Sequence, residues 1–190
     1  MNTIILNLNS VNLTEEQFYN LCQDNETLKL ERNAKGELLI MPPIGGKSGK
    51  REAELITDVN IWNRQSQLGE VFSSSTSFRL PKGGERSPDV AWVSRDRWES
   101  LSAQDQEKFP PLCPDFIIEL RSRTDSLKSL QEKMAEYLDN GLRLGWLIDP
   151  QEQQVAIYRQ SQPVEILALP TCLSGEDVLP GFKLEIGIFD

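Results

Sequence analysis

The stretch DFIIEL, residues 115–120, decides the fold because it combines a run of apolar residues with a single internal acid. Its β-branched and aromatic residues predict a buried strand near the centre of a sheet. Side chains alternate along a strand, so Ile117, Glu119 and Arg121 face one side and the other apolar residues face the opposite side. An unpaired carboxylate in such a strand is costly. We therefore expect Glu119 either to meet a cation or to lie where the strand end opens to water.

Hydrophobic periodicity predicts the elements on either side of this strand. Helices are expected over 14–23, over 48–65, and from a cap at Thr124 or Asp125 to Asn140-Gly141, with a partly helical stretch over 95–108. A hairpin is expected over 28–41, and further strands over 72–80, 88–94, 144–148, 155–159, 164–169 and 182–186. This order indicates an α/β domain with a mixed central sheet flanked by helices.

The chain has 190 residues, which predicts one domain with a core large enough to need no disulfides. Its 20 basic and 29 acidic residues give a formal net charge of −9. Such a chain repels phosphate as a whole, which argues against a uniformly basic nucleic-acid binder. A local basic patch, or a metal ion that bridges carboxylates to phosphate, is compatible with this charge.

Histidine is absent from the sequence. This excludes Ser-His-Asp and Cys-His triads, HExxH zinc proteases and histidine general bases. The three cysteines, Cys22, Cys113 and Cys172, form no CxxC pair, so we expect neither a disulfide scaffold nor a zinc site. The first residues lack a signal-peptide pattern, and no stretch is long and apolar enough to span a membrane. A cytoplasmic protein is therefore expected.

Two acids on neighbouring strands are candidates for metal binding. Asp89 follows Pro88 and opens one predicted strand, whereas Glu119 lies near the end of another. Two carboxylates form the hard oxygen site that Mg²⁺ takes, with water and substrate phosphate as further ligands. The alternatives are a turn-forming role for Asp89 and a structural ion pair of Glu119 with Arg121 or Lys133.

Three segments resemble a known family. They are Ser87-Pro88-Asp89-Val90, the run PDFIIELRS at 114–122, and the spaced residues Lys133, Tyr137, Gly141, Trp146 and Asp149-Pro150. Together they are similar to the putative restriction endonuclease-like family of the PD-(D/E)xK nuclease superfamily, a large bacterial family that is expanded in photosynthetic bacteria. The resemblance extends from about Leu28 to the C-terminus. It implies an αβββαβ core and phosphodiester cleavage that depends on Mg²⁺ or Mn²⁺.

The resemblance also assigns roles to single residues. Asp89 corresponds to the Asp metal ligand of the family, and Glu119 to the acid of the (D/E)xK motif. Where that motif has its lysine, this chain has Arg121, which can clamp phosphate but does not readily release a proton. The resemblance implies that a lysine of the following helix replaces the missing one, which indicates Lys133. By itself, Lys133 would be a solvated helix lysine.

Nucleases of this fold often add a glutamate from the first core helix, and here Glu52 and Glu54 compete for that role. Glu52 falls on the helix face of Leu55 and Val59, whereas Glu54 points away, so Glu52 is favoured. Basic residues near the two long helices are candidates for phosphate contacts, although such clusters are usually hydrated surface. They are Lys47, Lys50, Arg51, Arg121, Arg123 and Lys128.

The leading hypothesis is a Mg²⁺-dependent endonuclease that hydrolyses nucleic acid, with DNA as the favoured substrate. Asp89 and Glu119 would hold the metal, and Glu52 would assist them. Lys133 would polarise the attacking water or a transition-state oxygen, and Arg121 would steady the scissile phosphate. The alternative is a family member that has lost catalysis and serves as a nucleic-acid-binding or assembly module, because the lysine is displaced and the chain is acidic.

The organisation expected from the sequence is one endonuclease-like domain over 1–190. Residues 1–43 would form an N-terminal helix and hairpin, 44–150 the nuclease core, and 151–190 extra C-terminal strands. Families of this fold often pair, and the apolar strand over 164–169 offers an edge at which a homodimer could form.

Overall fold

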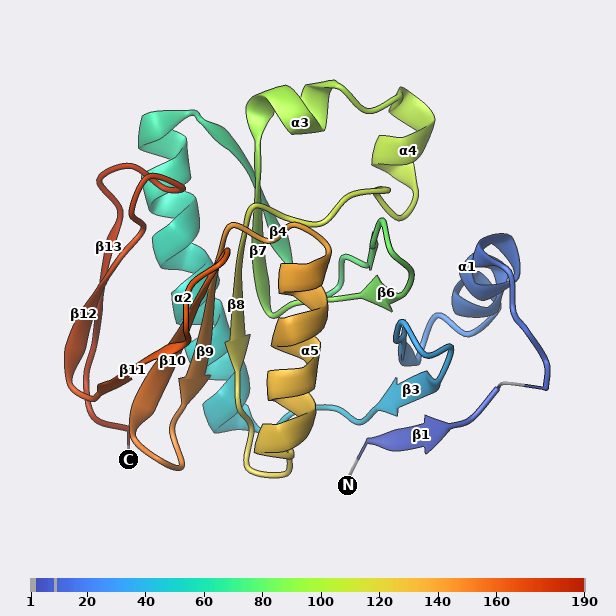
Figure 1. The fold of residues 1–190 in the computed structure, drawn as a ribbon, viewed down its shortest axis with the longest axis horizontal. Helices are drawn as coiled ribbons and strands as arrows, with labels where there is room; N and C mark the ends of the chain where they lie inside the picture. Colours follow the sequence, from blue (N-terminus) through green and yellow to red (C-terminus); the bar gives the residue numbers. More distant parts are fainter. Residues whose placement is uncertain (1–2, 9, 190) are drawn as a thin grey trace.

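The computed structural model describes residues 3–8 and 10–189, and a six-stranded sheet lies at its centre (Figure 1). The core elements are α2 (Gly46–Ser66), β4 (Gly69–Ser73), β7 (Val90–Ser94), β8 (Phe116–Leu120), α5 (Leu127–Asp139) and β9 (Leu144–Asp149), followed by β10 (Gln154–Arg159) and β11 (Glu165–Ala168). The strands are ordered β11-β10-β9-β8-β7-β4. Only β8 and β9 run parallel within this sheet, so the predicted mixed sheet and the αβββαβ order are confirmed.

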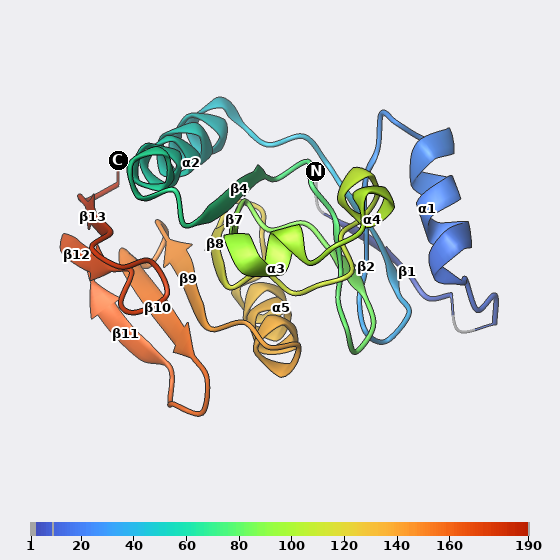
Figure 2. The ribbon, with the colours of Figure 1, turned by 90° about the horizontal axis from the view of Figure 1, so that it is seen from above.

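The two faces of this sheet are covered by different helices, α2 on one side and α5 on the other (Figure 2). The α2 face packs Leu55 and Val59 against alternate strand residues such as Ile118 and Trp146. On the opposite face, Met134 of α5 and its neighbours pack against Ile117. The predicted central position of the 115–120 strand is correct, because every residue of β8 is buried.

Local sequence explains how closely α5 approaches the sheet. A Cβ atom at Gly145 of β9 would lie only 2.6 Å from Met134 Cε, so a larger residue there would force the Met134 side chain to move. The helix ends at Asp139 with Asn140 as its C-cap, and Gly141 follows with φ +101°, a left-handed conformation that favours glycine. At the other end, the predicted cap at Thr124 or Asp125 is wrong. Ser126 caps α5 instead, and the Asp125 carboxylate accepts a hydrogen bond from Ser122 N.

A second, smaller sheet lies beside the core. It contains β1 (Ile4–Leu6), β2 (Lys29–Arg32), β3 (Leu38–Met41), β5 (Phe78–Arg79) and β6 (Glu85–Arg86), in the order β1-β3-β2-β6-β5. The predicted hairpin over 28–41 supplies β2 and β3. Helix α1 (Glu15–Asp24), capped by Thr14 as predicted, buries Phe18 against this hairpin.

The single strand predicted over 72–80 is wrong, because the chain turns after Ser73 and divides between the two sheets. Thr76 N donates to Ser73 O at 2.9 Å, which closes the turn. Residues before it belong to β4 of the large sheet, and Phe78 begins β5 of the small one. Phe72, Phe78 and Leu80 keep the same alternate spacing on both sides of this polar turn, which hides it from a periodicity argument.

The remaining elements extend the core. Short helices α3 (Arg95–Glu99) and α4 (Ala103–Glu107) fill the predicted partly helical stretch between β7 and β8. Strands β12 (Thr171–Ser174) and β13 (Lys183–Ile186) form a separate ribbon that packs on the α2 face. The sequence predicted β11 and β13 but missed β1, β6 and β12. The division into 1–43, 44–150 and 151–190 stays a prediction.

Cys22, Cys113 and Cys172 are all unpaired, which agrees with the expectation that the chain has no disulfide scaffold. Within 3–8 and 10–189, no helix combines the length and apolar character that crossing a bilayer requires.

Candidate functional site

Asp89 and Glu119 are brought together by strand register. β7 and β8 are antiparallel with Val90 opposite Ile118, so the next pair along the ladder places Asp89 opposite Glu119. Directly opposed residues of an antiparallel pair project to the same face. Here that face is the one covered by α5, because Ile117 and Ala91 also lie on it. Leu120 N donates to Asp89 Oδ2 at 2.7 Å, which fixes the Asp89 side chain at the end of β8.

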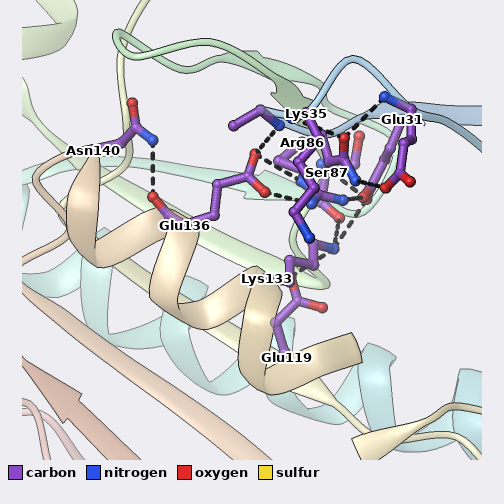
Figure 3. A network of polar contacts seen from close by, with 11 residues as sticks. Glu31, Lys35, Arg86, Ser87, Glu119, Lys133, Glu136 and Asn140 are labelled. Carbon is purple, nitrogen blue, oxygen red and sulfur yellow. Dashed lines mark hydrogen bonds and ion pairs between the residues drawn. The ribbon is translucent and has the colours of Figure 1, made fainter. Parts of the chain in front are cut away.

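Lys133 reaches the same place from α5 (Figure 3). Its Nζ lies 2.8 Å from Glu119 Oε1, donates to Glu31 Oε1 at 3.0 Å, and donates to the Ser87 carbonyl at 3.1 Å. The side chain is buried, and its Nζ lies 5.9 Å from the centre of the Tyr137 ring. Lys133, which its sequence position alone would suggest is a solvated helix lysine, is therefore part of a buried acidic cluster with Asp89, Glu119 and Glu31.

The carboxylates of this cluster differ in their electrostatic surroundings. Burial, with Asp89 and Glu31 nearby, raises the pKa of Glu119 to about 8, although Lys133 opposes the shift. Burial also raises the pKa of Asp89, against the opposing effect of Lys133. For Glu31, burial alone would raise the pKa, but Lys133 and Arg86 outweigh it and lower the pKa to about 2. For Lys133, burial lowers the pKa, and Glu119 and Glu31 reverse the shift to a net increase.

One oxygen of Glu119 is a candidate ligand for a cation. Oε1 is buried and lies close to the Lys133 ammonium, but no donor in the described part of the chain makes an aligned hydrogen bond to it. No group of three or more acidic or cysteine side chains gathers tightly enough to hold a metal within 3–8 and 10–189. Mg²⁺ needs only one or two carboxylates when water and phosphate complete its octahedron. The Asp89 and Glu119 pair therefore fits Mg²⁺ and does not fit an all-protein metal cage.

The two candidate glutamates of α2 have different environments. Glu52 is partly buried, lines the same cleft as Asp89 and Glu119, and accepts a short hydrogen bond from Ser74 Oγ. Glu54 is exposed and pairs with Lys50 at 3.5 Å. These positions agree with the choice of Glu52 from the helical periodicity, while its role stays a prediction.

Arg121 lies directly after β8 and also lines the cleft. Its guanidinium donates to Asp149 Oδ2 at 2.8 Å and, less closely, to the Asp125 carbonyl at 3.3 Å. Asp149 thus holds Arg121 at the cleft wall. The structural ion pair of Arg121 with Glu119, considered as an alternative, is replaced by this pair with Asp149.

A cleft of about 1000 Å³ surrounds the acidic cluster. Its walls come from the β2–β3 hairpin, the start of α2, the segment between β8 and α5, and Phe189, which follows β13. Basic side chains line it together with the acids, namely Lys29, Lys47, Arg51, Arg86, Arg121, Arg123 and Lys133. Two of the basic residues proposed from sequence lie outside it, because Lys50 pairs with Glu54 and Lys128 approaches Glu132 at 4.0 Å on exposed helix faces.

Sequence reasoning missed a buried charge network next to the cluster. Glu31 of β2 is 1% exposed and accepts hydrogen bonds from Arg86 at 3.0 Å and from Ser87 N at 3.1 Å. Arg86 also pairs with Glu136 of α5 at 2.5 Å. In the sequence, Glu31 stands in the alternating stretch LKLER and resembles an outward-facing strand residue. Only the packing of the hairpin against the core shows that both of its faces are covered.

The αβββαβ order defines a restriction-endonuclease-like α/β fold. A crystal structure described as "a putative nuclease belonging to DUF820 from Anabaena variabilis ATCC 29413" has a similar fold, with a TM-score of 0.71 over 84% of this chain and 87% of that one. The two sequences are 22% identical. The model of the Uma2 family, described as "Putative restriction endonuclease", matches residues 15–187, so the chain belongs to this family. No protein with a curated description matches the chain in sequence.

Proposed function

We propose that the protein is a Mg²⁺-dependent endonuclease that hydrolyses phosphodiester bonds in DNA. The observation that carries the proposal is the approach of Lys133 Nζ to within 2.8 Å of Glu119 Oε1, opposite Asp89 and inside a cleft lined by basic residues. This places the amine beside the acid although the motif has Arg121 at the usual lysine position. Membership of a restriction endonuclease family supports the same class of substrate.

The metal would be held by Asp89 and Glu119, and Glu52, which lines the same cleft, would assist them. A divalent ion in this position supplies positive charge that acidifies water and neutralises charge on the phosphate; Mn²⁺ can replace Mg²⁺ in such oxygen sites. The unmatched Oε1 of Glu119 supports its assignment as a ligand, because cation binding would satisfy a buried oxygen that has no aligned donor.

Lys133 acts in this proposal as a fixed hydrogen-bond donor. An ammonium group has three protons, and two of them bind Glu31 and the Ser87 carbonyl. The third is directed to the Glu119 side, where it can orient the attacking water or stabilise charge on a transition-state oxygen. Arg121, held by Asp149, can contact the scissile phosphate, and Lys47, Arg51 and the other basic residues of the cleft can contact neighbouring phosphates.

The test is cleavage of a panel of DNA and RNA forms with Mg²⁺, Mn²⁺ or EDTA. Purified wild-type protein should cut DNA only with a divalent ion, and Asp89→Ala or Glu119→Ala should abolish cleavage. Glu54→Ala is the matched control, because it removes an exposed acid from the same region and should leave the rate unchanged. Unchanged cleavage in both Asp89→Ala and Glu119→Ala would eliminate this mechanism.

A second readout is independent of turnover. Mg²⁺ that binds only the folded protein raises its stability by about 2.7 kcal/mol at 100 times the dissociation constant. We expect this increase in thermal unfolding of wild type and of Glu54→Ala, and its loss in Glu119→Ala. Equal stabilisation of all three proteins would place the ion elsewhere.

The alternative function is binding of nucleic acid without cleavage. The 2.8 Å contact between Lys133 and Glu119 also supports this alternative, because a buried ion pair can stabilise the fold without taking part in catalysis. DNA binding without cleavage under any metal condition would support it.

Pairing into a homodimer through β11 is a further proposal, supported by the free edge of that strand and the 59% exposed Ile166. A monomeric mass in solution would refute it.

A further inference from the structure

Glu31 is the most buried acid in contact with Lys133, yet it belongs to none of the αβββαβ elements. It comes from β2 in the small sheet and is 1% exposed. Its carboxylate accepts from Lys133 Nζ, from Arg86 and from Ser87 N. Because three donors from two different segments meet on one side chain, Glu31 is the group around which the amine is arranged (Figure 3).

We propose that Glu31 is a positioning residue, which holds the Lys133 ammonium so that one of its protons is directed at the Glu119 side of the cleft. The proton count supports this role. Lys133 has three N–H groups, and Glu31 and the Ser87 carbonyl accept two of them in aligned hydrogen bonds. The 2.8 Å contact with Glu119 Oε1 is an ion pair that lacks the alignment of a hydrogen bond, so the third N–H has no aligned acceptor in the described part of the chain.

Without Glu31, the same ammonium would have two accepting groups left. Lys133 would then rotate toward Glu119 and form an aligned pair with Oε1, because a buried ammonium needs acceptors. That pair would occupy the oxygen assigned to the metal and withdraw the proton from the position of the substrate. Small displacements of a catalytic group lower the rate by about 10²-fold.

The connections of Glu31 also explain how it is held in place. Ser87 N and Arg86 bind its two oxygens, and Arg86 is bound in turn by Glu136, one turn of α5 beyond Lys133. Ala34 N of the hairpin turn donates to Glu136 Oε1 at 3.1 Å. The hairpin and α5 are therefore linked by polar contacts at two points, and the Glu31 carboxylate has little freedom to follow the ammonium.

The experiment compares Glu31→Gln with two matched controls. Glu85→Gln removes another acid of the small sheet, which is 2% exposed and pairs with Arg32 but not with Lys133. Asp115→Asn removes a buried acid before the start of β8, which is 2% exposed and pairs with Arg97 but not with Lys133. All three changes replace one buried carboxylate by a neutral amide, and only Glu31→Gln alters a carboxylate that accepts from the Lys133 ammonium and makes one of its two oxygens a donor.

The first readout does not require activity. In ¹⁵N–¹H spectra of lysine ammonium groups, a buried and hydrogen-bonded Lys133 should give a distinct signal, which is assigned by its loss in Lys133→Arg. We expect Glu31→Gln to shift this signal or to broaden it beyond detection, and both controls to leave it in place. A Lys133 signal that is unchanged in Glu31→Gln, or equally changed in Glu85→Gln, would overturn the proposal.

The second readout rests on the proposed nuclease function. In steady-state cleavage, Glu31→Gln should lower kcat about 10²-fold and leave KM within about threefold, since the phosphate contacts of the cleft remain. Equal losses of kcat in the controls would overturn the positioning role. If wild type does not cleave but the Lys133 signal responds as expected, the positioning role stands and the proposed function fails. Should Glu31→Gln not fold, Glu31→Asp, which keeps the charge but shortens the side chain, takes its place in both readouts.

Discussion

Two buried acids lie near opposite ends of strand β8, Asp115 directly before its first residue and Glu119 next to its last. They differ in how far their carboxylate oxygens are hydrogen-bonded. At the start, Asp115 is 2% exposed and fully matched, since Ser94 N donates to Oδ2 and Arg97 pairs with Oδ1, both at 2.9 Å. At the other end, Glu119 is 3% exposed and has an oxygen without an aligned donor. The same degree of burial therefore accompanies a structural acid at one end and a candidate ligand at the other. The distinction lies in the partners and not in the exposure.

The largest expected effect is that replacing Glu119 lowers activity and replacing Asp115 lowers stability. Glu119→Gln should lower cleavage at least 10³-fold while costing little stability, because it removes a buried carboxylate that lacks a full set of partners. Asp115→Asn should do the reverse, with cleavage within a few-fold of wild type and a stability loss of about 2 kcal/mol. Cleavage rates and urea unfolding of both variants check this. Equal loss of activity in both variants would contradict the assignment of a structural role to Asp115 and a ligand role to Glu119.

The next effect concerns the amine that stands only at the Glu119 end. Lys133→Met keeps most of the length of the side chain and removes its charge, so we expect a fall in kcat of about 10² to 10³-fold. Lys133→Arg keeps the charge but replaces a compact ammonium by a planar group, so it should recover only a small part of the rate. Single-turnover cleavage at saturating substrate measures both. Full activity of Lys133→Met would show that this amine takes no part in catalysis.

A third buried acid, Glu31, extends the comparison to pH. Its pKa lies near 2 in the folded protein and near 4.5 when unperturbed, because Lys133 and Arg86 together outweigh burial. A lowered pKa in the fold stabilises the protein at every pH above about 4.5, and this contribution is lost as the pH falls toward 2. Wild type should therefore lose up to about 3 kcal/mol more than Glu31→Gln over this interval. Urea denaturation at a series of pH values provides the measurement, and parallel curves for the two proteins would contradict the assignment.

The smallest effect is expected at the edge of the Asp115 site. Arg143 lies 3.9 Å from Asp115 and is 43% exposed, so solvent screens the pair. Arg143→Ala should change stability by less than about 0.5 kcal/mol and leave cleavage unaffected. Arg97, which approaches the same oxygen to 2.9 Å, is the informative counterpart. A larger loss in Arg143→Ala than in Arg97→Ala would reverse the ranking of these two contacts.

The sequence predicted those parts of the fold that follow from local pattern. The alternation in 115–120 placed β8 at the centre of the sheet and identified Glu119 as the exception within it. Helical periodicity found α2 and α5 and favoured Glu52 over Glu54. The candidate site was partly accessible for the same reason, since Asp89 and Glu119 stand at strand ends that register brings together.

The missed features depend on contacts between distant segments. Glu31 and Arg86 are 55 residues apart and read as ordinary polar residues, because nothing near either of them shows that both become buried. The turn after Ser73 was hidden because Phe72 and Phe78 on its two sides keep the same alternate spacing. Ser126 replaced Asp125 as the helix cap because the Asp125 carboxylate binds Ser122 N instead. In each case the competing partner, and not the local propensity, determines the outcome.

The buried bonds between the β2–β3 hairpin and α5 bear on how the chain can be shortened. A fragment beginning at residue 44 would retain every αβββαβ element and all the residues proposed to bind metal. It would also leave Arg86 and Lys133 each without the carboxylate of Glu31, in an interior where cations need partners. We therefore expect such a fragment to express as insoluble material. The unit that folds autonomously would then be larger than the segment that carries the residues proposed to bind metal.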